Sequence, residues 1–257
     1  MTQVALMAPT TLLPHVQPLS RYHLVLAYKV IYDRKYQEYC ARRSKEGDYI
    51  ILDNGAVEKG GKSIPMKDIV LAALLIKPSL IVLPDFLFDS LRTLDETENA
   101  LRSPHMKFLK RVHPSVKICT IVQGVDEEDW LECFNILNDT HNGIDVLGVP
   151  KITGQVFGSR LNVLKKISKK VKKPCHLFGV WWKTTLEEIG QEGQFDFVQG
   201  IDTPKPVRLA VSGLELKDWA KMPRGKDFLD RPHNGVDLEL LRRNCEQFIE
   251  LVNGGTL

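Results

Sequence analysis

The chain has 257 residues, of which 43% are hydrophobic and 26% are charged, and its formal net charge is +3. This balance excludes a fibrous or intrinsically disordered chain and is typical of one large folded domain. No apolar run approaches the roughly 20 residues that span a bilayer, and the first 20 residues lack the basic start and long apolar core of a signal peptide. We therefore expect a cytoplasmic protein with no membrane partner.

The five cysteines are dispersed along the chain. They indicate neither a disulfide framework nor a cysteine zinc site, because no two of them are spaced as Cys-x-x-Cys. We expect buried, unreactive thiols at Cys40, Cys119, Cys133, Cys175 and Cys245.

Short apolar runs alternate with longer amphipathic runs, which predicts repeated βα units around a parallel sheet. After an irregular segment at residues 1–21, strands are expected at His23–Tyr28, Tyr49–Asp53, Leu80–Asp85, Val116–Gln123, Ile144–Val149, His176–Val180 and Phe195–Asp202. Helices are expected between them, at Tyr32–Lys45, Met66–Ile76, Leu91–Val112, Glu127–Leu137, Ser159–Val171 and Thr185–Gly190. The eighth unit is expected to be a short strand at Val207–Val211 with a closing helix at Val236–Val252. This repetition favours a single α/β domain over residues 1–257, a (β/α)8 barrel of the TIM type, over a doubly wound sheet.

Polar residues stand at the carboxyl ends of the predicted strands, where catalysis takes place in such barrels. One aspartate at such a point often caps the following turn, and Asp202, followed by Thr203 and Pro204, fits that role by itself. Several polar groups directed at one mouth indicate a shared site instead. The residues are Asp53, Asp85, Gln123, Gly148, His176, Gly179 and Asp202.

Three strand-end carboxylates admit two kinds of chemistry. In the first, Asp53, Asp85 and Asp202 hold a hard cation such as Mg²⁺ for hydrolysis or phosphate chemistry. In the second, one aspartate attacks a sugar carbon to form a covalent glycosyl intermediate, and another transfers the proton. Gln123 and the backbone at Gly148 are suited to reading the hydrogen-bonding edge of a flat heterocycle, which favours the second.

A basic run at Arg160–Lys173 has its apolar residues at helical spacing, which predicts one exposed, positively charged helix face. That face is either simply solvated or contacts phosphates. Trp181, Trp182 and Lys183 form a second region of interest, either as rim packing or as a surface on which an unpaired base stacks. The lysines of the run are Lys165, Lys166, Lys169, Lys170, Lys172 and Lys173.

Three segments share a pattern with one known family. Residues 122–124 read VQG, residues 53–56 read DNGA, and Asp202 is followed by a proline four residues later and an arginine, Arg208, six residues later. In this order and spacing, between Tyr49 and Arg208, the chain resembles the tRNA-guanine transglycosylases, which exchange guanine for a 7-deazaguanine base on an irregular (β/α)8 barrel. The family has DSGG in place of DNGA.

The resemblance implies a role for individual residues. Asp202 matches the nucleophile of the family and Asp53 its proton-handling aspartate. Asp85 matches the residue that recognises the amino and ring N–H groups of guanine, and Gln123 the residue that reads its carbonyl side. Backbone contact with the base is implied for Gly148 and Val149, and His176 and Phe178 are implied to flank the base and position the nucleophile. Arg208 and the lysine run are the candidates for contact with the nucleic acid. The implied reaction is a double displacement that requires no metal or other cofactor.

The chain departs from the tRNA enzymes because it has no zinc-binding Cys-x-Cys-x-x-Cys segment of the kind that helps them grip tRNA. Its LPDF, LGVPK and IDTPKPV segments are more similar to compact phage and bacterial relatives (the DpdA group), which place 7-deazaguanines in DNA. We therefore expect DNA and a free 7-deazaguanine base as substrates, in a bacterial or phage-infected host cytoplasm. The alternatives are a tRNA substrate, a metal-dependent barrel hydrolase, and a non-catalytic nucleic-acid-binding subunit. A homodimer or an accessory DNA-opening protein is the candidate protein partner.

Overall fold

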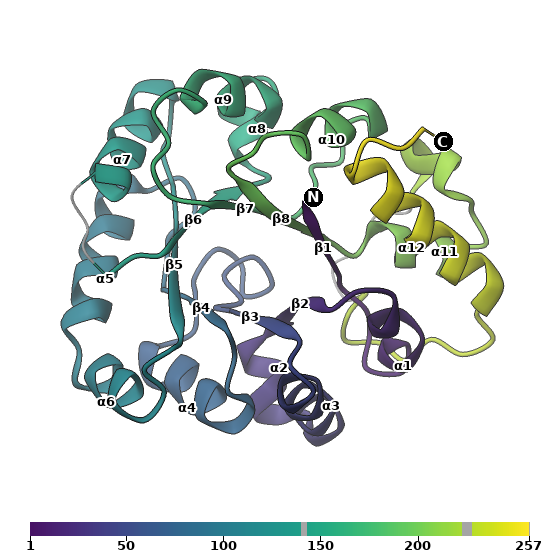
Figure 1. The fold of residues 1–257 in the computed structure, drawn as a ribbon, viewed down its shortest axis with the longest axis horizontal. Coiled ribbons are helices and arrows are strands. Elements are labelled where there is room, and N and C mark those ends of the chain that lie inside the picture. Colours follow the sequence, from purple (N-terminus) through teal and green to yellow (C-terminus); the bar gives the residue numbers. More distant parts are fainter. Residues whose placement is uncertain (140–142, 223–227, 257) are drawn as a thin grey trace.

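Eight parallel strands form a nearly closed ring at the centre of the protein in the computed structural model, which describes residues 1–139, 143–222 and 228–256 (Figure 1). The hydrogen-bonded order runs from β2 through β3, β4, β5, β6 and β7 to β8 and then β1, and β1 lies against β2 without a hydrogen-bonded ladder among the described pairings. The strands are β1 Gln3–Leu6, β2 Tyr22–Leu26, β3 Tyr49–Asp53, β4 Leu80–Val82, β5 Lys117–Ile121, β6 Val146–Pro150, β7 Cys175–Phe178 and β8 Val198–Thr203.

Helices surround this ring, so the predicted single-domain (β/α)8 barrel is confirmed (Figure 1). Within the described residues, no helix has the length and apolar character needed to cross a bilayer. The helices are α1 Leu13–Val16, η1 Gln17–Leu19, α2 Ala27–Tyr32, α3 Arg34–Lys45, α4 Met66–Ile76, α5 Ser90–Arg102, α6 Pro104–Val112, α7 Glu127–Asp139, α8 Thr153–Val156, α9 Arg160–Ile167, α10 Leu186–Glu192, α11 Lys205–Val211, η2 Leu216–Lys221 and α12 Leu238–Val252.

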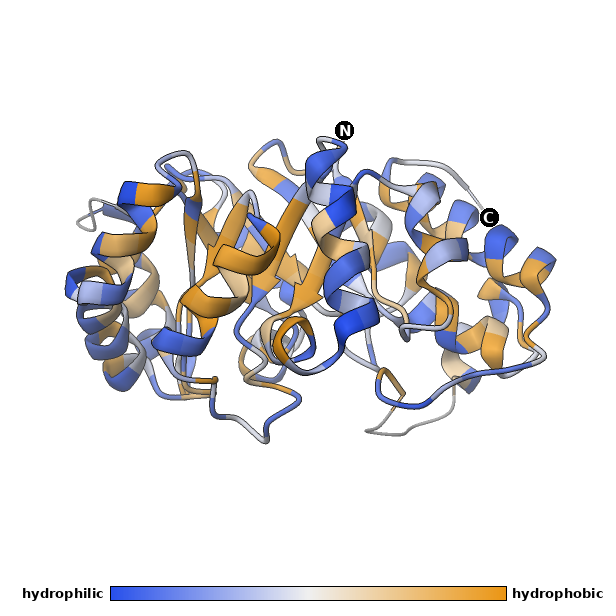
Figure 2. Cartoon of the chain, turned by 90° about the horizontal axis from the view of Figure 1, so that it is seen from below, coloured by the Kyte–Doolittle hydropathy of each residue, from blue (hydrophilic) through white to orange (hydrophobic). Residues whose placement is uncertain are grey.

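Successive side chains along each strand point to opposite faces of the sheet, so the strands contribute to two apolar cores. Ile51 and Val146 belong to the core inside the ring, whereas their neighbours Leu52 and Leu147 belong to the larger core between the ring and the helices. The strands are accordingly orange along most of their length in Figure 2, and the helices mix orange and blue. Because both faces of the sheet are covered, polar groups are concentrated at the strand ends.

The eighth strand is not where the sequence predicted it. Val207–Val211 lies in α11, because Pro206 fits the first turn of a helix and would interrupt a strand ladder. The strand that completes the sheet is β1, in the segment predicted to be irregular, and it pairs with β8 so that Ala5 lies opposite Asp202. The predicted single helix at Leu91–Val112 is two helices, because Ser103 caps α6 and Pro104 begins it.

A buried ion pair anchors the end of β7. The guanidinium of Arg160, at the start of α9, donates from Nη2 to Oε2 of Glu192 at 2.7 Å and from Nε to Oε1 at 3.1 Å, and both side chains are at most 2% exposed. Arg160 Nη1 also donates to the carbonyl of Gly179 at 2.7 Å. The pair therefore ties α9 and α10 to the residue that follows β7, at the barrel mouth.

Removing one partner of this pair is expected to cost more than removing one partner of an exposed pair. In Glu192→Ala the Arg160 charge stays buried without a carboxylate, so the free energy of unfolding should fall by about 3–5 kcal/mol. The matched control is Glu127→Ala, which breaks a half-exposed pair with Lys166 and should cost about 0–1 kcal/mol. Urea unfolding followed by circular dichroism measures both, and equal losses would contradict the anchoring role.

Candidate active site

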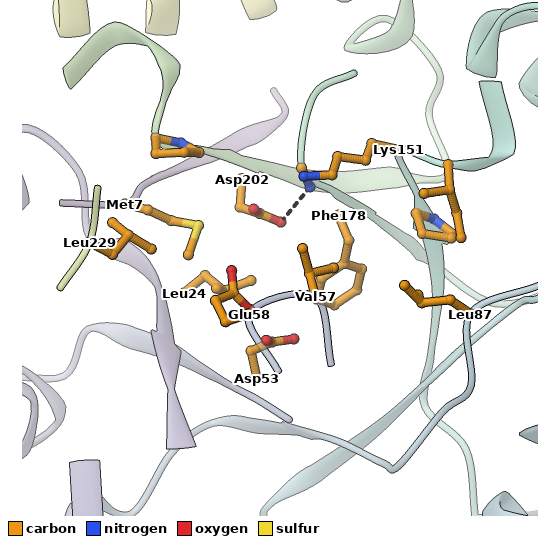
Figure 3. A pocket seen from close by; sticks show the side chains of 14 residues that line it. Met7, Leu24, Asp53, Val57, Glu58, Leu87, Lys151, Phe178, Asp202 and Leu229 are labelled. Atoms are coloured by element: carbon orange, nitrogen blue, oxygen red, sulfur yellow. Dashed lines mark hydrogen bonds between the residues drawn. The ribbon is translucent and has the colours of Figure 1, made fainter. Parts of the chain in front are cut away.

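A hollow of about 110 Å³ opens at the carboxyl ends of the strands, and three carboxylates reach into it from two directions (Figure 3). The side chain of Asp202 points into the hollow from β8. Asp53 points into it from β3, and Glu58 from the loop that follows β3. The remaining wall is largely apolar. It includes Met7, Leu24, Val57, Leu87, Phe178 and Leu229, with Lys151 at one side.

The carboxylate of Asp202 is held by two donors on the neighbouring strand. Its Oδ1 accepts from the backbone N–H of Gly179 at 3.1 Å and lies 3.1 Å from Nε2 of the fully buried His176. The other ring nitrogen of His176, Nδ1, lies 2.9 Å from the hydroxyl of Tyr22. A neutral His176 protonated at Nε2 satisfies both contacts, because the ring then accepts from Tyr22 and donates to Asp202. Among the described residues no donor reaches Oδ2, which leaves that oxygen for chemistry.

The turn after β8 is capped by another residue. Thr203 Oγ1 accepts from the backbone N–H of Lys205 at 3.1 Å, so the turn does not use the Asp202 carboxylate. The alternative that Asp202 serves only as a turn cap therefore does not describe this site.

Asp53 occupies a different environment. Its Oδ2 accepts one hydrogen bond, from the backbone N–H of Gly55 at 2.9 Å. Burial raises the pKa of Asp53 well above its ordinary value, and the nearby negative charges of Glu58, Asp202 and Asp85 raise it further. Asp53 is therefore suited to carry and deliver a proton, whereas Asp202 is fixed in orientation by two hydrogen bonds.

Asp85 is fixed by two side-chain amides. It lies just beyond β4 and is 3% exposed; Oδ1 accepts from Asn54 Nδ2 at 2.8 Å and Oδ2 from Gln123 Nε2 at 2.6 Å. Burial raises the pKa of Asp85, and the hydrogen bonds from Asn54 and Gln123 oppose that rise. Gln123 Oε1 in turn accepts from the backbone N–H of Phe88 at 3.2 Å. These hydrogen bonds therefore hold Asn54, Asp85 and Gln123 in place without a bound ligand.

A smaller hollow over Asp85 and Gln123 adjoins the first. Both hollows are lined by Asp53 and Phe178, with Val57 and Leu87 contributing from the loops after β3 and β4. The structure thus brings Asp53, Asp85 and Asp202 to one mouth. Within the part of the chain that the structure describes, no three His, Cys, Asp or Glu side chains are grouped as ligands of a single metal ion.

The residues expected to contact the base or to position the nucleophile take different places around the pocket. Val149 packs in the outer core with no exposure. Gly148 faces inward but is covered, since a Cβ there would lie 2.3 Å from Ile121 Cδ1 and 2.8 Å from the Phe178 ring. His176 stands behind Asp202 as a positioning residue and does not flank the pocket. The absence of a side chain at Gly148 makes room for Phe178, which does line both hollows.

The lysine run does not lie at the mouth. Its second half immediately precedes β7, which puts it at the amino ends of the strands, opposite the mouth. Lys172 pairs there with Asp139 at 3.0 Å, and Lys173 Nζ donates to two carbonyls at the end of α7. Within the run, Lys165, Lys166, Lys169, Lys170, Lys172 and Lys173 line none of the hollows at the mouth, whereas Arg208 lines one.

Several side chains that line the candidate site or contact its residues were not predicted. Asn54 and Tyr22 act through other side chains, and no local pattern distinguishes them. Glu58 lies five residues beyond the end of β3, in a loop whose path the sequence does not specify. Lys151 could have been identified, because it directly follows β6 in the LGVPK segment.

Replacing Asp53 with asparagine is expected to stabilise the fold in a pH-dependent way. Because the folded-state pKa of Asp53 is raised, the folded protein holds this proton more tightly than the unfolded chain, so the wild type loses stability as pH rises above about 4. Asp53→Asn removes that loss, so its gain in unfolding free energy should grow from pH 4 toward neutrality. Urea unfolding across this range tests it, with the exposed Asp196→Asn as control. A gain that is constant or shrinks with pH would contradict the assignment.

Neither a scan against protein-family models nor a search of curated proteins finds a match to this chain. The assignment of a function therefore rests on the residues at the mouth. Their arrangement combines an oriented carboxylate, a proton-holding carboxyl group and a rigid set of amide and carboxylate groups around one apolar slot.

Proposed function

We propose that this protein is a base-exchange transglycosylase, which replaces guanine in DNA with a 7-deazaguanine base through a covalent glycosyl intermediate on Asp202. The observation that carries the proposal is the difference between two facing carboxyl groups. Asp202 is oriented by His176 and the Gly179 N–H with one oxygen left for attack, and Asp53 holds its proton tightly.

The reaction is a double displacement. A guanine nucleotide is flipped into the mouth, and Oδ2 of Asp202 attacks C1′ of the sugar as the bond from C1′ to guanine breaks. Asp53 gives its proton to the departing base. An incoming 7-deazaguanine returns a proton to Asp53, attacks C1′ and displaces Asp202, so two inversions retain the original configuration.

The smaller hollow recognises the base. The carboxylate of Asp85 accepts from N–H groups of guanine, and the remaining donor of Gln123 reads a carbonyl oxygen. The ring of Phe178 supplies an apolar face. Val57 is half exposed and lines both hollows, so a shift of its side chain joins them into one slot for a bicyclic base.

Asp202→Asn is expected to lose exchange of labelled guanine by more than about 10³-fold, because the amide is a poor nucleophile, while base binding persists. The measurement offers duplex DNA, single-stranded DNA and tRNA in parallel, with and without a chelator, and follows incorporated label and trapped protein–nucleic-acid adduct. Asp196→Asn is the control.

Near-parental exchange by Asp202→Asn would overturn the nucleophile assignment. Label entering tRNA alone would make tRNA the substrate, and activity abolished by chelation would favour the metal-dependent hydrolase. A parent protein that binds DNA, exchanges no base and yields no adduct would favour the non-catalytic subunit.

Asp85→Ala is expected to impair recognition and leave the chemical step nearly intact. Each N–H group of the base that is left unpaired in a buried slot costs roughly 1–3 kcal/mol, which corresponds to about a 5- to 150-fold rise in KM with kcat little changed. Steady-state kinetics with free guanine as the varied substrate measures this. A fall in kcat with unchanged KM would instead place Asp85 in the chemical step.

A further inference from the structure

A second hollow of about 250 Å³ lies beside the catalytic pocket. It shares three lining residues with that pocket, Lys151, Gly179 and Pro204, so the two hollows adjoin at the end of β7. Its own wall combines cationic and aromatic side chains. They are Lys205 and Arg208 from α11 and Trp181 and Trp182 from the segment after β7.

Lys205 is a buried cation in this wall. It is 4% exposed, its Nζ donates to the carbonyl of Trp181 at 3.1 Å, and it lies 4.1 Å from the ring centre of Trp219. Among the described residues no carboxylate pairs with Lys205, and the charges that influence it are those of Lys151 and Arg208. Burial and the nearby charges of Lys151 and Arg208 lower the pKa of Lys205 to about 7. An anionic ligand bound in this hollow would offset the repulsion between these cations and would favour the charged form of the Lys205 amine.

The tryptophan side chains of this wall indicate which class of anion the hollow would bind. Trp182 is 53% exposed, and its ring lies 5.9 Å from that of Trp181 in an edge-to-face arrangement. Lys183 Nζ lies 5.1 Å from the ring centre of Trp182. An exposed tryptophan next to a cationic hollow is the combination with which proteins hold single-stranded nucleic acid, because the ring stacks on a base while cations contact the backbone.

Gly179 connects the two hollows. Its φ of +65° is in the left-handed region that favours glycine, and a Cβ there would lie 2.9 Å from Cδ of Lys151. The aliphatic stem of Lys151 therefore packs across the end of β7. The backbone N–H of the same glycine holds Asp202 on the catalytic side.

We propose that this second hollow binds the phosphate adjacent to the target nucleotide, with Lys205 and Lys151 contacting that phosphate and Trp182 stacking on the neighbouring base of an unpaired strand. The proposal rests on the proposed function in one respect, since it takes the catalytic pocket to hold a flipped nucleotide. It goes further by placing the strand on the α11 side of the mouth and away from the lysine run.

The test measures binding without turnover, in an Asp202→Asn background, by fluorescence anisotropy of a guanine-containing single strand of about 12 nucleotides. Lys205→Met should weaken binding about tenfold and reduce the slope of log K against log salt by about 0.7, the share of one phosphate contact. Lys205→Arg should restore binding because it keeps the charge. The matched control is Lys169→Met, at the opposite end of the barrel, which should bind like the parent.

A strand with one neutral methylphosphonate linkage locates the contact. When that linkage is next to the target guanine, Lys205→Met should have no further effect; at a distant linkage the loss should remain. Parental binding by Lys205→Met, or the same loss at every linkage, would overturn the subsite. Circular dichroism confirms that each variant is folded.

The experiments can reject the proposed subsite without rejecting the proposed function, and the reverse. Exchange that proceeds equally in the parent and in Lys205→Met, with catalytic Asp202 present, would overturn the subsite and leave the function standing. Lysine-dependent, linkage-specific binding in a protein that exchanges no base would support the subsite and reject the transglycosylase reaction.

Discussion

The pair of hydrogen bonds that holds Oδ1 of Asp202 is the constraint on which the rest of the site depends. One comes from His176 inside β7 and the other from the backbone just beyond it, so both require β7 and β8 to lie in one register, with His176 opposite Gly200. Gly200 has no side chain, and the Tyr22 ring occupies the space that a Cβ would take. Tyr22 then fixes His176, and the Arg160–Glu192 pair fixes the end of β7 from outside. Core packing thus sets the direction of one carboxylate oxygen.

Three aspartates at one mouth acquire different properties from their surroundings. Asp202 accepts from a histidine and a backbone amide, Asp85 accepts from two side-chain amides, and Asp53 has a single backbone donor and three acidic neighbours. Burial raises the pKa of Asp53 and of Asp85, and hydrogen bonds to the charged form oppose that rise. The three aspartates therefore differ in their surroundings: Asp202 has one oxygen left open, both oxygens of Asp85 accept hydrogen bonds, and Asp53 has a single donor and a raised pKa.

Positive charge is distributed unevenly between the two ends of the barrel. Just before β7, Lys172 is paired with Asp139 and Lys173 donates to carbonyls that end α7, so these two lysines stabilise a helix end where backbone oxygens are unpaired. The cations at the mouth are fewer, but Lys205 is buried and lines a hollow that adjoins the pocket of the three carboxylates. A small number of desolvated charges next to a pocket discriminates ligands more strongly than many solvated ones.

The sequence by itself determined the barrel, because alternating βα units have a period that can be read locally, and it placed Asp53, Asp85, Gln123 and Asp202 at strand ends that must meet in a parallel sheet. Only the tertiary structure decided that β1 completes the ring, that Val149 points outward, and that the second half of the lysine run lies at the end of the barrel opposite the mouth. It also decided that Asn54 contacts Asp85, that Tyr22 contacts His176, and that Lys205 lines a second hollow. The physical reason is the range of the interactions. Strand periodicity depends on neighbours in the chain, whereas the partner of a strand and the burial of a polar side chain depend on residues that packing brings together from far along it.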